Sequence, residues 1–530
     1  MSVQVTSAPP PAPVAAPPQP SGLSLLFKTE DWLAVWVGFL VIVLVLVLVL
    51  AGVPVKLPKF KWTTDGAFAA KVAQVRDAGL VEKLESGAAE KGAKALQADL
   101  GALRAAMVAA DRMAVADAAK KVEASAKAAP DGGKAGKLAK DLRAEASNRA
   151  GGIFAGENLL WAVYIGIAYL ILTTVALRLM GQKAMQLAVG FPVVFALAWL
   201  AQFIAGNSTV VYYGVEYVLW CLFLGLFVSN VLGVPAWLKP AVRTEFYIKS
   251  GLVVLGAGIL FGEIVQAGAY GIVQGLLVVI AVWYFTYWVA RKLRVDDEFA
   301  AVLSSAVSIC GVSAAIATGG AIKADGKKIS YTTSIVLLCA IPMLIFQPMI
   351  AKWVGLSDIV AGAWLGGTLD TSGSVVAAGA LISDTAMKTG VIVKMSQNVL
   401  IGVAAFILSV VWTMRQAGAA GRERPGAIEI WHRFPKFVLG FAAASILFSF
   451  IIDAKTVEAT KGALSGLRTW WFALAFASIG LETRFGELTK MEGGRPAGAF
   501  LIGQAFNIFW TLLLAWLIFG GVLFGVPAIK

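Results

Sequence analysis

The feature that most constrains this chain is the apolar run from Asp31 to Val53, DWLAVWVGFLVIVLVLVLVLAGV. Folded as a helix, its apolar core is long enough to cross the roughly 30 Å of hydrocarbon in a bilayer. Valine and leucine alternate within it, which also suits a strand, but an isolated strand leaves its backbone groups unpaired in lipid. The run therefore predicts a membrane-spanning helix over residues 31–53.

Apolar segments recur after residue 151, at 158–180, 185–206, 211–232, 246–264, 268–290, 330–350, 388–412, 433–452, 467–483 and 497–524. Two others, 300–321 and 361–382, are crowded with Gly, Ser and Thr, as in helices that break inside a membrane. Hydrophobic residues make up 58% of the chain and charged residues 15%, a composition that excludes an ordinary soluble protein. We predict an all-α polytopic membrane protein with about 11–13 transmembrane segments. Whether the two broken segments cross the membrane or are re-entrant stays open.

Residues 54–150 have a different composition, with 18 Lys and Arg against 12 Asp and Glu in a matrix of alanine. Their apolar residues recur at helical spacing, so we expect an exposed, soluble helical insert. It is either a spacer without a site of its own or a sensor or docking module. Residues 1–30, rich in Pro, Ala and Ser, are expected to form a disordered tail, and residues 151–530 the transporter core.

Basic residues in the short loops indicate the orientation. If the apolar segments alternate in direction, these residues all fall on one side, and an excess of Lys and Arg marks the cytoplasmic side. We therefore expect a cytoplasmic N-terminus and a periplasmic or extracellular insert, although Lys56, Lys59 and Lys61 favour the opposite. The residues used are Arg178, Lys183, Lys239, Arg243, Lys249, Arg291, Lys292 and Arg294.

The sequence lacks the common patterns of enzyme and metal sites. It has one histidine, His432, and three cysteines without paired spacing, so neither a zinc site nor a disulfide framework is indicated. No stretch has the Gly-Lys-Ser/Thr ending of a nucleotide-binding loop. The net charge is +13, but no basic stripe with interleaved aromatics typical of nucleic-acid binding is present. We expect no enzymatic activity, no cofactor and no nucleic-acid partner.

Two parts of the apolar region resemble each other. Residues 251–264, GLVVLGAGILFGEI, are similar to residues 472–488, FALAFASIGLETRFGEL, and one more span follows each copy. An odd number of spans separates the copies, so they are inverted, as is common in secondary transporters. The alternative is a chance match of two Gly-rich runs.

The two broken segments are where we expect a binding site. They read SSAVSICGVSAAIATGG (304–320) and GGTLDTSGSVVAAGA (366–380). Interrupted helices expose N-terminal N–H groups, and two such ends pointing inward can hold an anion. Close packing of small residues between membrane helices is the alternative. The candidate substrate-binding residues are Ser308, Cys310, Gly311, Ser313, Thr368, Thr371, Ser372, Gly373, Ser374, Lys394 and Asn398.

Asp370 is the candidate coupling residue. An acidic side chain at membrane depth is costly, so a functional role is the first interpretation. It would bind a coupling sodium ion or a proton. Lys394 and Asn398, spaced i and i+4, place a cation and an amide on one face of the next helix, although Lys394 can instead snorkel to the interface.

These residues resemble the sulfate exporter family of bacterial membrane proteins, the YeiH type. The matching pieces are SICGVSA (308–314), AIKAD (321–325), AGAWLGGT (361–368), VVAAG (375–379) and VKM (393–395). The resemblance covers roughly residue 151 to the C-terminus. It implies an inverted-repeat transporter organised like the sodium/proton antiporters and bile-acid transporters, with export of sulfate or a related sulfur oxyanion. Where many members carry a His-Glu pair after Gly-Gly-Thr, this chain has Leu369 and Asp370.

Three functions follow as hypotheses. The first is a secondary transporter that moves a small anion, namely sulfate, sulfite or an organosulfonate, across the inner membrane. The second is a cation/proton antiporter that uses Asp370 as the exchanged carboxylate. The third is a membrane receptor or scaffold that acts through the helical insert. Membrane lipid surrounds the chain in all three, and a homodimer stays open.

Overall fold

The computed structural model describes residues 25–129, 132–182, 184–212, 215–415, 431, 434–484 and 494–529. These residues are overwhelmingly helical, and the β pairing among them is an isolated bridge between Trp62 and Asn207. Eight helices in the described ranges are long and apolar enough to cross a membrane. This confirms the prediction of an all-α polytopic membrane protein. His432 lies outside the described residues.

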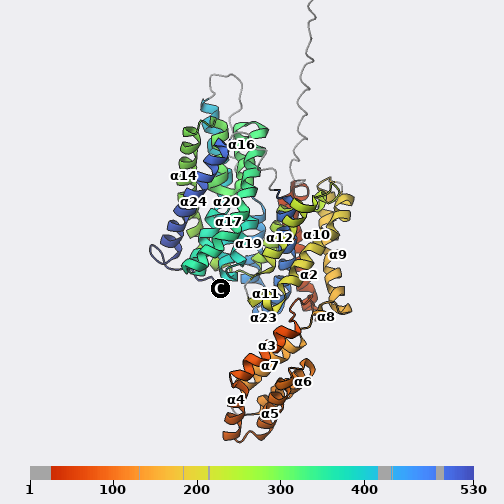
Figure 1. Cartoon of the computed structure of the whole chain (residues 1–530). Coiled ribbons are helices and arrows are strands. Elements are labelled where there is room, and N and C mark those ends of the chain that lie inside the picture. Colours follow the sequence, from red (N-terminus) through yellow and green to blue (C-terminus); the bar gives the residue numbers. More distant parts are fainter. Residues whose placement is uncertain are drawn as a thin grey trace, which may run out of the picture.

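The insert is a separate small helical unit that projects from one end of the molecule (Figure 1). Its own core includes Phe68, Leu100 and Val115. The two ends of the unit meet, because the Thr63 N–H donates to the Asn148 carbonyl oxygen at 2.8 Å. Its helices are α3 (Asp65–Asp77), α4 (Leu80–Glu90), α5 (Lys94–Ala109), α6 (Arg112–Ala128) and α7 (Gly133–Ser147).

The remaining helices form two bundles that lie side by side in Figure 1. The first, here called the scaffold bundle, is packed by stacked aromatic pairs such as Phe195 with Trp470, whose ring centroids are 4.6 Å apart. Short helices α1 (Leu25–Lys28), α8 (Ala150–Ile153) and α11 (Ser208–Tyr212) flank its long ones. The long ones are α2 (Glu30–Leu50), α9 (Gly156–Leu179), α10 (Ala184–Ala205), α12 (Tyr217–Phe227) with η2 (Val228–Leu232), α13 (Thr244–Gly256), α22 (Phe437–Ile446) with η5 (Leu447–Ile451), and α23 (Ala454–Glu482).

The second bundle, here called the hairpin bundle, contains both broken segments. Its helices pack mainly against one another, and few contacts join it to the scaffold bundle, through the pairs α13–α19, α14–α22 and α19–α23. The members are α14 (Phe261–Lys292), α15 (Asp297–Ser305) with η4 (Ala306–Cys310), α16 (Gly311–Ile322), α17 (Gly326–Val354), α18 (Asp358–Thr368), α19 (Ser372–Ala380), α20 (Asp384–Arg415) and α24 (Arg495–Phe519).

The first broken segment folds back on itself. Residues 297–322 are long and apolar enough to cross, but a Cβ added at Gly319 would lie 3.5 Å from Val302, a residue of the opposite arm. Asp296, which precedes α15, lies 2.6 Å from the Lys328 ammonium at the start of α17. The segment therefore begins and ends at one face, and we call it hairpin 1.

The second broken segment is also a hairpin. A Cβ added at Gly362 in α18 would lie 2.4 Å from the Ala386 carbonyl oxygen, and one added at Gly379 in α19 would lie 2.5 Å from the Met387 Cα. Both arms thus lie against the first turns of α20. This segment, hairpin 2, turns at Leu369–Thr371.

The two hairpins enter from opposite faces. Hairpin 1 starts at the face where α2 begins, here the Glu30 face, and α17 crosses from there to the insert face, where hairpin 2 starts (Figure 1). The crossings are then α2, α9, α10, α12 with η2, α13, α14, α17, α20, α22 with η5, α23 and α24. This agrees with the lower limit of the expected range.

The predicted repeat copies run in opposite directions. Helices α13 and α23 pack together antiparallel, as do α14 and α24. The segments predicted at 246–264 and 268–290 have different bounds, because α13 ends at Gly256 and α14 begins at Phe261. The Leu260 N–H donates to the Glu263 carboxylate at 3.3 Å and starts α14 early. Residues 485–488 of the second copy lie outside the described residues.

Candidate functional site

The tips of the two hairpins touch. A Cβ added at Gly311 would lie 3.0 Å from both the Cβ and the carbonyl oxygen of Asp370, and 2.4 Å from Val336. Glycine permits this close approach of two backbones. The two broken segments therefore form a single site, although they are far apart in the sequence.

A cavity of about 360 Å³ lies against the tips, between the two bundles. Its wall on the scaffold side includes Asp31, Glu245 and Lys249, which lie at the Glu30 face. The cavity therefore extends from the hairpin tips towards the Glu30 face. The predicted residues that line it are Cys310, Ser313, Asp370, Thr371, Ser372 and Asn398.

Two helix N-termini meet at this cavity. Helix α16 begins at Gly311 and α19 at Ser372, and first-turn N–H groups have no acceptor within their own helix. The Thr371 hydroxyl caps α19 by accepting from the Ser374 N–H at 3.1 Å. Partial positive charge at both ends favours an anion in the cavity.

Lys394 lies at the hairpin tips and not at the membrane interface. Its side chain is 2% exposed. The ammonium group donates to the Ile309 carbonyl oxygen at 2.6 Å and to Gln397 Oε1 at 3.1 Å. Gln397 in turn donates to the Ser308 carbonyl oxygen at 2.8 Å. Lys394 therefore holds the π-helical turn of hairpin 1 and contributes positive charge behind the cavity.

Other predicted residues support the hairpins and do not line the cavity. The Thr368 hydroxyl donates to the Trp364 carbonyl oxygen at 2.7 Å and accepts from Gln347. Gly373 faces Ile248 and Ile479 of the scaffold bundle. The Ser308 side chain is fully buried, and its hydroxyl has no hydrogen-bond partner among the described residues.

Asp370 is buried in the cavity wall, with 2% of its surface exposed. Its Oδ2 atom has no hydrogen-bond partner within the described part of the chain, and the same holds for Asn398 Oδ1. The Asn398 amide donates to the Ser372 hydroxyl at 3.3 Å. Buried acceptors without partners are rare and indicate a role for a ligand or a proton.

A charged cluster at the mouth of the cavity was not predicted as part of the site. The Lys249 ammonium lies 2.9 Å from Glu30, 2.9 Å from Asp31 and 3.6 Å from Glu245. Glu245 and Lys249 are spaced i and i+4, which is a visible signal for an ion pair on one helix. Their proximity to α2 depends on tertiary packing, which no local pattern predicts.

Three buried amide side chains behind the hairpins were also not predicted from the sequence. Asn507 donates to the Val307 carbonyl oxygen at 3.0 Å, and Gln504 to that of Thr368 at 2.9 Å. Gln274 donates to the Ala363 carbonyl oxygen at 2.9 Å. The Val307 and Thr368 carbonyl groups lie at the two breaks, whereas that of Ala363 lies inside α18. Amides inside apolar segments were the signal that would have found them.

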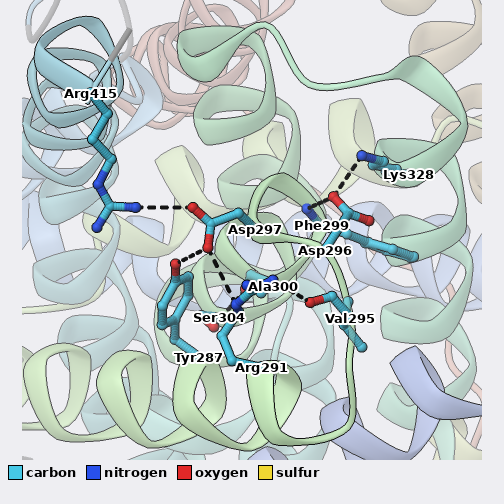
Figure 2. Close-up of polar contacts among 10 residues, drawn as sticks. All are labelled: Tyr287, Arg291, Val295, Asp296, Asp297, Phe299, Ala300, Ser304, Lys328 and Arg415. Carbon is cyan, nitrogen blue, oxygen red and sulfur yellow. Dashed lines mark hydrogen bonds and ion pairs between the residues drawn. The ribbon is translucent and has the colours of Figure 1, made fainter.

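Figure 2 shows the polar contacts that anchor the root of hairpin 1. The Asp297 carboxylate lies 3.0 Å from Arg415 of α20 and 3.4 Å from Arg291 of α14, and it accepts from the Tyr287 hydroxyl. Hairpin 1 is therefore fixed to its own bundle. No cluster of His, Cys, Asp and Glu suited to a metal ion occurs among the described residues.

Comparison with known proteins points to one family. A family model described as Conserved hypothetical protein 698 matches residues 189–499. A UPF0324 membrane protein of Rhodopirellula baltica is 42% identical, over 68% of this chain and 68% of the relative. One from Nitratidesulfovibrio vulgaris is 41% identical, over 65% of this chain and 62% of the relative, so less than two thirds of that relative is spanned. No solved structure matches.

Proposed function

The chain belongs to the UPF0324 family of membrane proteins, and we propose that it is a secondary transporter of a small oxyanion. The substrate class is sulfate, sulfite or an organosulfonate. The observation that carries the proposal is the meeting of two opposed hairpins at one cavity, with the N-termini of α16 and α19 beside it. Secondary transporters place their substrate sites at such broken helices near the midplane.

The site can bind an oxyanion mainly through uncharged hydrogen-bond donors. Backbone N–H groups at two helix N-termini, the hydroxyls of Ser313 and Ser372, and the Asn398 amide can donate to oxygen atoms. The Lys394 ammonium adds a positive charge behind the cavity wall, beside the Ile309 carbonyl oxygen. A tetrahedral or trigonal sulfur oxyanion presents acceptors in several directions and suits donors from two hairpins.

Asp370 is proposed to couple transport to a proton or a sodium ion. An ionised carboxylate and an anionic substrate repel each other in one small cavity of low dielectric constant. Binding of a proton or a cation to Asp370 removes that repulsion. The anion and the coupling ion then bind together and move in the same direction.

The two bundles provide the moving parts of the proposed mechanism. Few contacts join them, and the cavity lies between them. Displacement of the hairpin bundle along the scaffold bundle would carry the tips, with a bound anion, towards the insert face. We place the chain in the inner membrane with the Glu30 face cytoplasmic, since Arg178 and Arg291 lie in the last turns of α9 and α14 at that face and Arg243 precedes α13 there.

A cation/proton antiporter is the second candidate, and one observation favours it. The ionisable residues that line the cavity are mainly acidic, with Asp31, Glu245 and Asp370 against Lys249. In that mechanism Asp370 exchanges a cation for a proton, and the hydroxyls ligate the cation. Sodium-driven proton release in a buffer without oxyanions would support it.

The test is sulfate uptake by proteoliposomes with and without an imposed pH or sodium gradient. We expect the gradient to accelerate uptake and to drive accumulation above equilibrium. Sulfite and small sulfonates should compete with sulfate. Sodium-dependent proton movement without any sulfate flux would overturn the anion proposal in favour of the antiporter.

A further inference from the structure

A second cavity, of about 490 Å³, lies between the bundles at the opposite, insert face. Its walls are the bend at residues 257–260, the first turns of α14 and α20, η5, and α23. It is separate from the cavity at the hairpin tips, because none of the described residues lines both. Two charged side chains deep in this second cavity set its chemistry.

Arg468 of α23 and Lys388 of α20 face each other across the boundary between the bundles. Their side chains are only 13% and 11% exposed. Both lie beside the Asp384 carboxylate, Lys388 at 2.9 Å and Arg468 at 3.5 Å. The Asp384 side chain is 56% exposed, so a carboxylate that reaches in from the rim lies beside both largely buried cations.

The Arg468 guanidinium is under-satisfied. Its Nε atom is buried and has no hydrogen-bond partner among the described residues. The contacts that it makes there run through Nη2, to Ser465 at 3.4 Å and to Asp384 at 3.5 Å. A guanidinium offers five N–H donors in a planar fork that matches an oxyanion. A buried donor without an acceptor in a cavity indicates a ligand.

Three further charged side chains line this cavity, those of Glu263, Glu458 and Lys461. The Glu263 carboxylate accepts from the Leu260 N–H at 3.3 Å and caps α14. Glu458 and Lys461 are both exposed. The Arg468 and Lys388 side chains lie deep in the wall, and the exposed Asp384 carboxylate beside them occupies the position that an oxyanion would take.

We infer that Arg468 and Lys388 form a second oxyanion site, which receives the anion at the insert face. The inference rests on the proposed function and deepens it, because the same anion would pass from this site to the hairpin tips. Helix α20 carries both Lys388 and Lys394, within two helical turns. The anion displaces the Asp384 carboxylate from Arg468, which also removes an ion pair that links the bundles.

The experiment measures sulfate transport in proteoliposomes while sulfate is varied at one face at a time. Arg468→Gln should raise the half-saturating sulfate concentration at the insert face about tenfold and leave that at the Glu30 face within about twofold, since an Arg–oxyanion contact is worth about 1.4 kcal/mol or more. Arg468→Lys should fall between. Lys455→Gln, which removes an exposed positive charge from the same helix, is the matched control. Equal shifts at both faces, or none, would overturn the inference.

A binding measurement separates this inference from the proposed function. Ser465→Cys places a thiol in the second cavity, beside Arg468. Sulfate should slow the reaction of this thiol with a maleimide, and Arg468→Gln should remove the protection. Protection without any sulfate flux would support the second oxyanion site and contradict only the proposed transport. Sulfate flux without protection would support the proposed transport and contradict the second oxyanion site.

Discussion

The Lys394 ammonium lies 2.6 Å from the Ile309 carbonyl oxygen, so that helix α20 holds the tip of hairpin 1. The carbonyl belongs to the π-helical turn before Gly311, where the α-helical hydrogen bonding of α15 has ended. A charged donor in a buried position forms a strong hydrogen bond. One side chain thus links the long helix α20 to the break that creates the site.

Replacement of this lysine should loosen the tip. Lys394→Met keeps an unbranched side chain but leaves the Ile309 carbonyl oxygen without its donor, which should cost about 2–3 kcal/mol of stability. The thermal unfolding temperature in detergent measures the loss. Lys327→Met, an exposed position on α17, is the control and should change little. Equal unfolding temperatures for both variants would contradict a supporting role for Lys394.

Glycines permit the close packing of hairpin 2 against α20. Gly362→Ala should destabilise the protein strongly, because the added Cβ would lie 2.4 Å from the Ala386 carbonyl oxygen, a backbone atom. Gly462→Ala in α23 is the matched control, since nothing lies within 4 Å of its added Cβ. There alanine should be neutral or stabilise by up to about 1 kcal/mol. Unfolding temperatures of the two variants test the difference, and similar values would refute the hairpin packing.

Asp370→Asn tests coupling. The amide has nearly the same shape and is permanently neutral, so the fold and anion binding should persist. Gradient-driven accumulation of sulfate should be lost, while sulfate exchange at equal concentrations continues. Normal response to the gradient in this variant would remove Asp370 from the coupling role.

Deletion of the insert separates transport from the receptor or scaffold hypothesis. The Thr63 N–H and the Asn148 carbonyl oxygen are 2.8 Å apart, so a short Gly-Ser linker can replace residues 65–147. The insert has its own core, and we expect sulfate transport to stay within about twofold of the full chain, because no insert residue in the described ranges lines the hairpin cavity. Loss of the cellular function in a stable, folded deletion variant, with no sulfate flux detectable in the full chain either, would favour the third hypothesis.

The sequence predicted the helical fold well because membrane spans follow from length and hydrophobicity alone. It also located the broken segments, since Gly, Ser and Thr gather there. It left their folding back open, because the contacts that decide it, such as Asp296 with Lys328, join residues of different helices.

For the site, too, the sequence predicted some residues and left others open. Residues of the two motifs, among them Ser313, Asp370 and Ser372, line the cavity as a local pattern can predict. Others in the same motifs, such as Gly373, point elsewhere because a helix turns successive residues to different sides. The side chains that α2 and α13 bring to the cavity lie there because of tertiary packing, and the sequence shows only the i, i+4 spacing of Glu245 and Lys249.

The most direct test of the central claim is the thermal stability of the purified protein with sulfate, sulfite, sulfonates, carboxylates, sodium and varied pH, since a ligand of the folded state raises stability. We predict that a sulfur oxyanion raises the unfolding temperature, and that Ser313→Ala combined with Ser372→Ala reduces the shift. A shift with sodium or pH alone, and none with any oxyanion, would contradict the claim that the hairpin tips bind an anion.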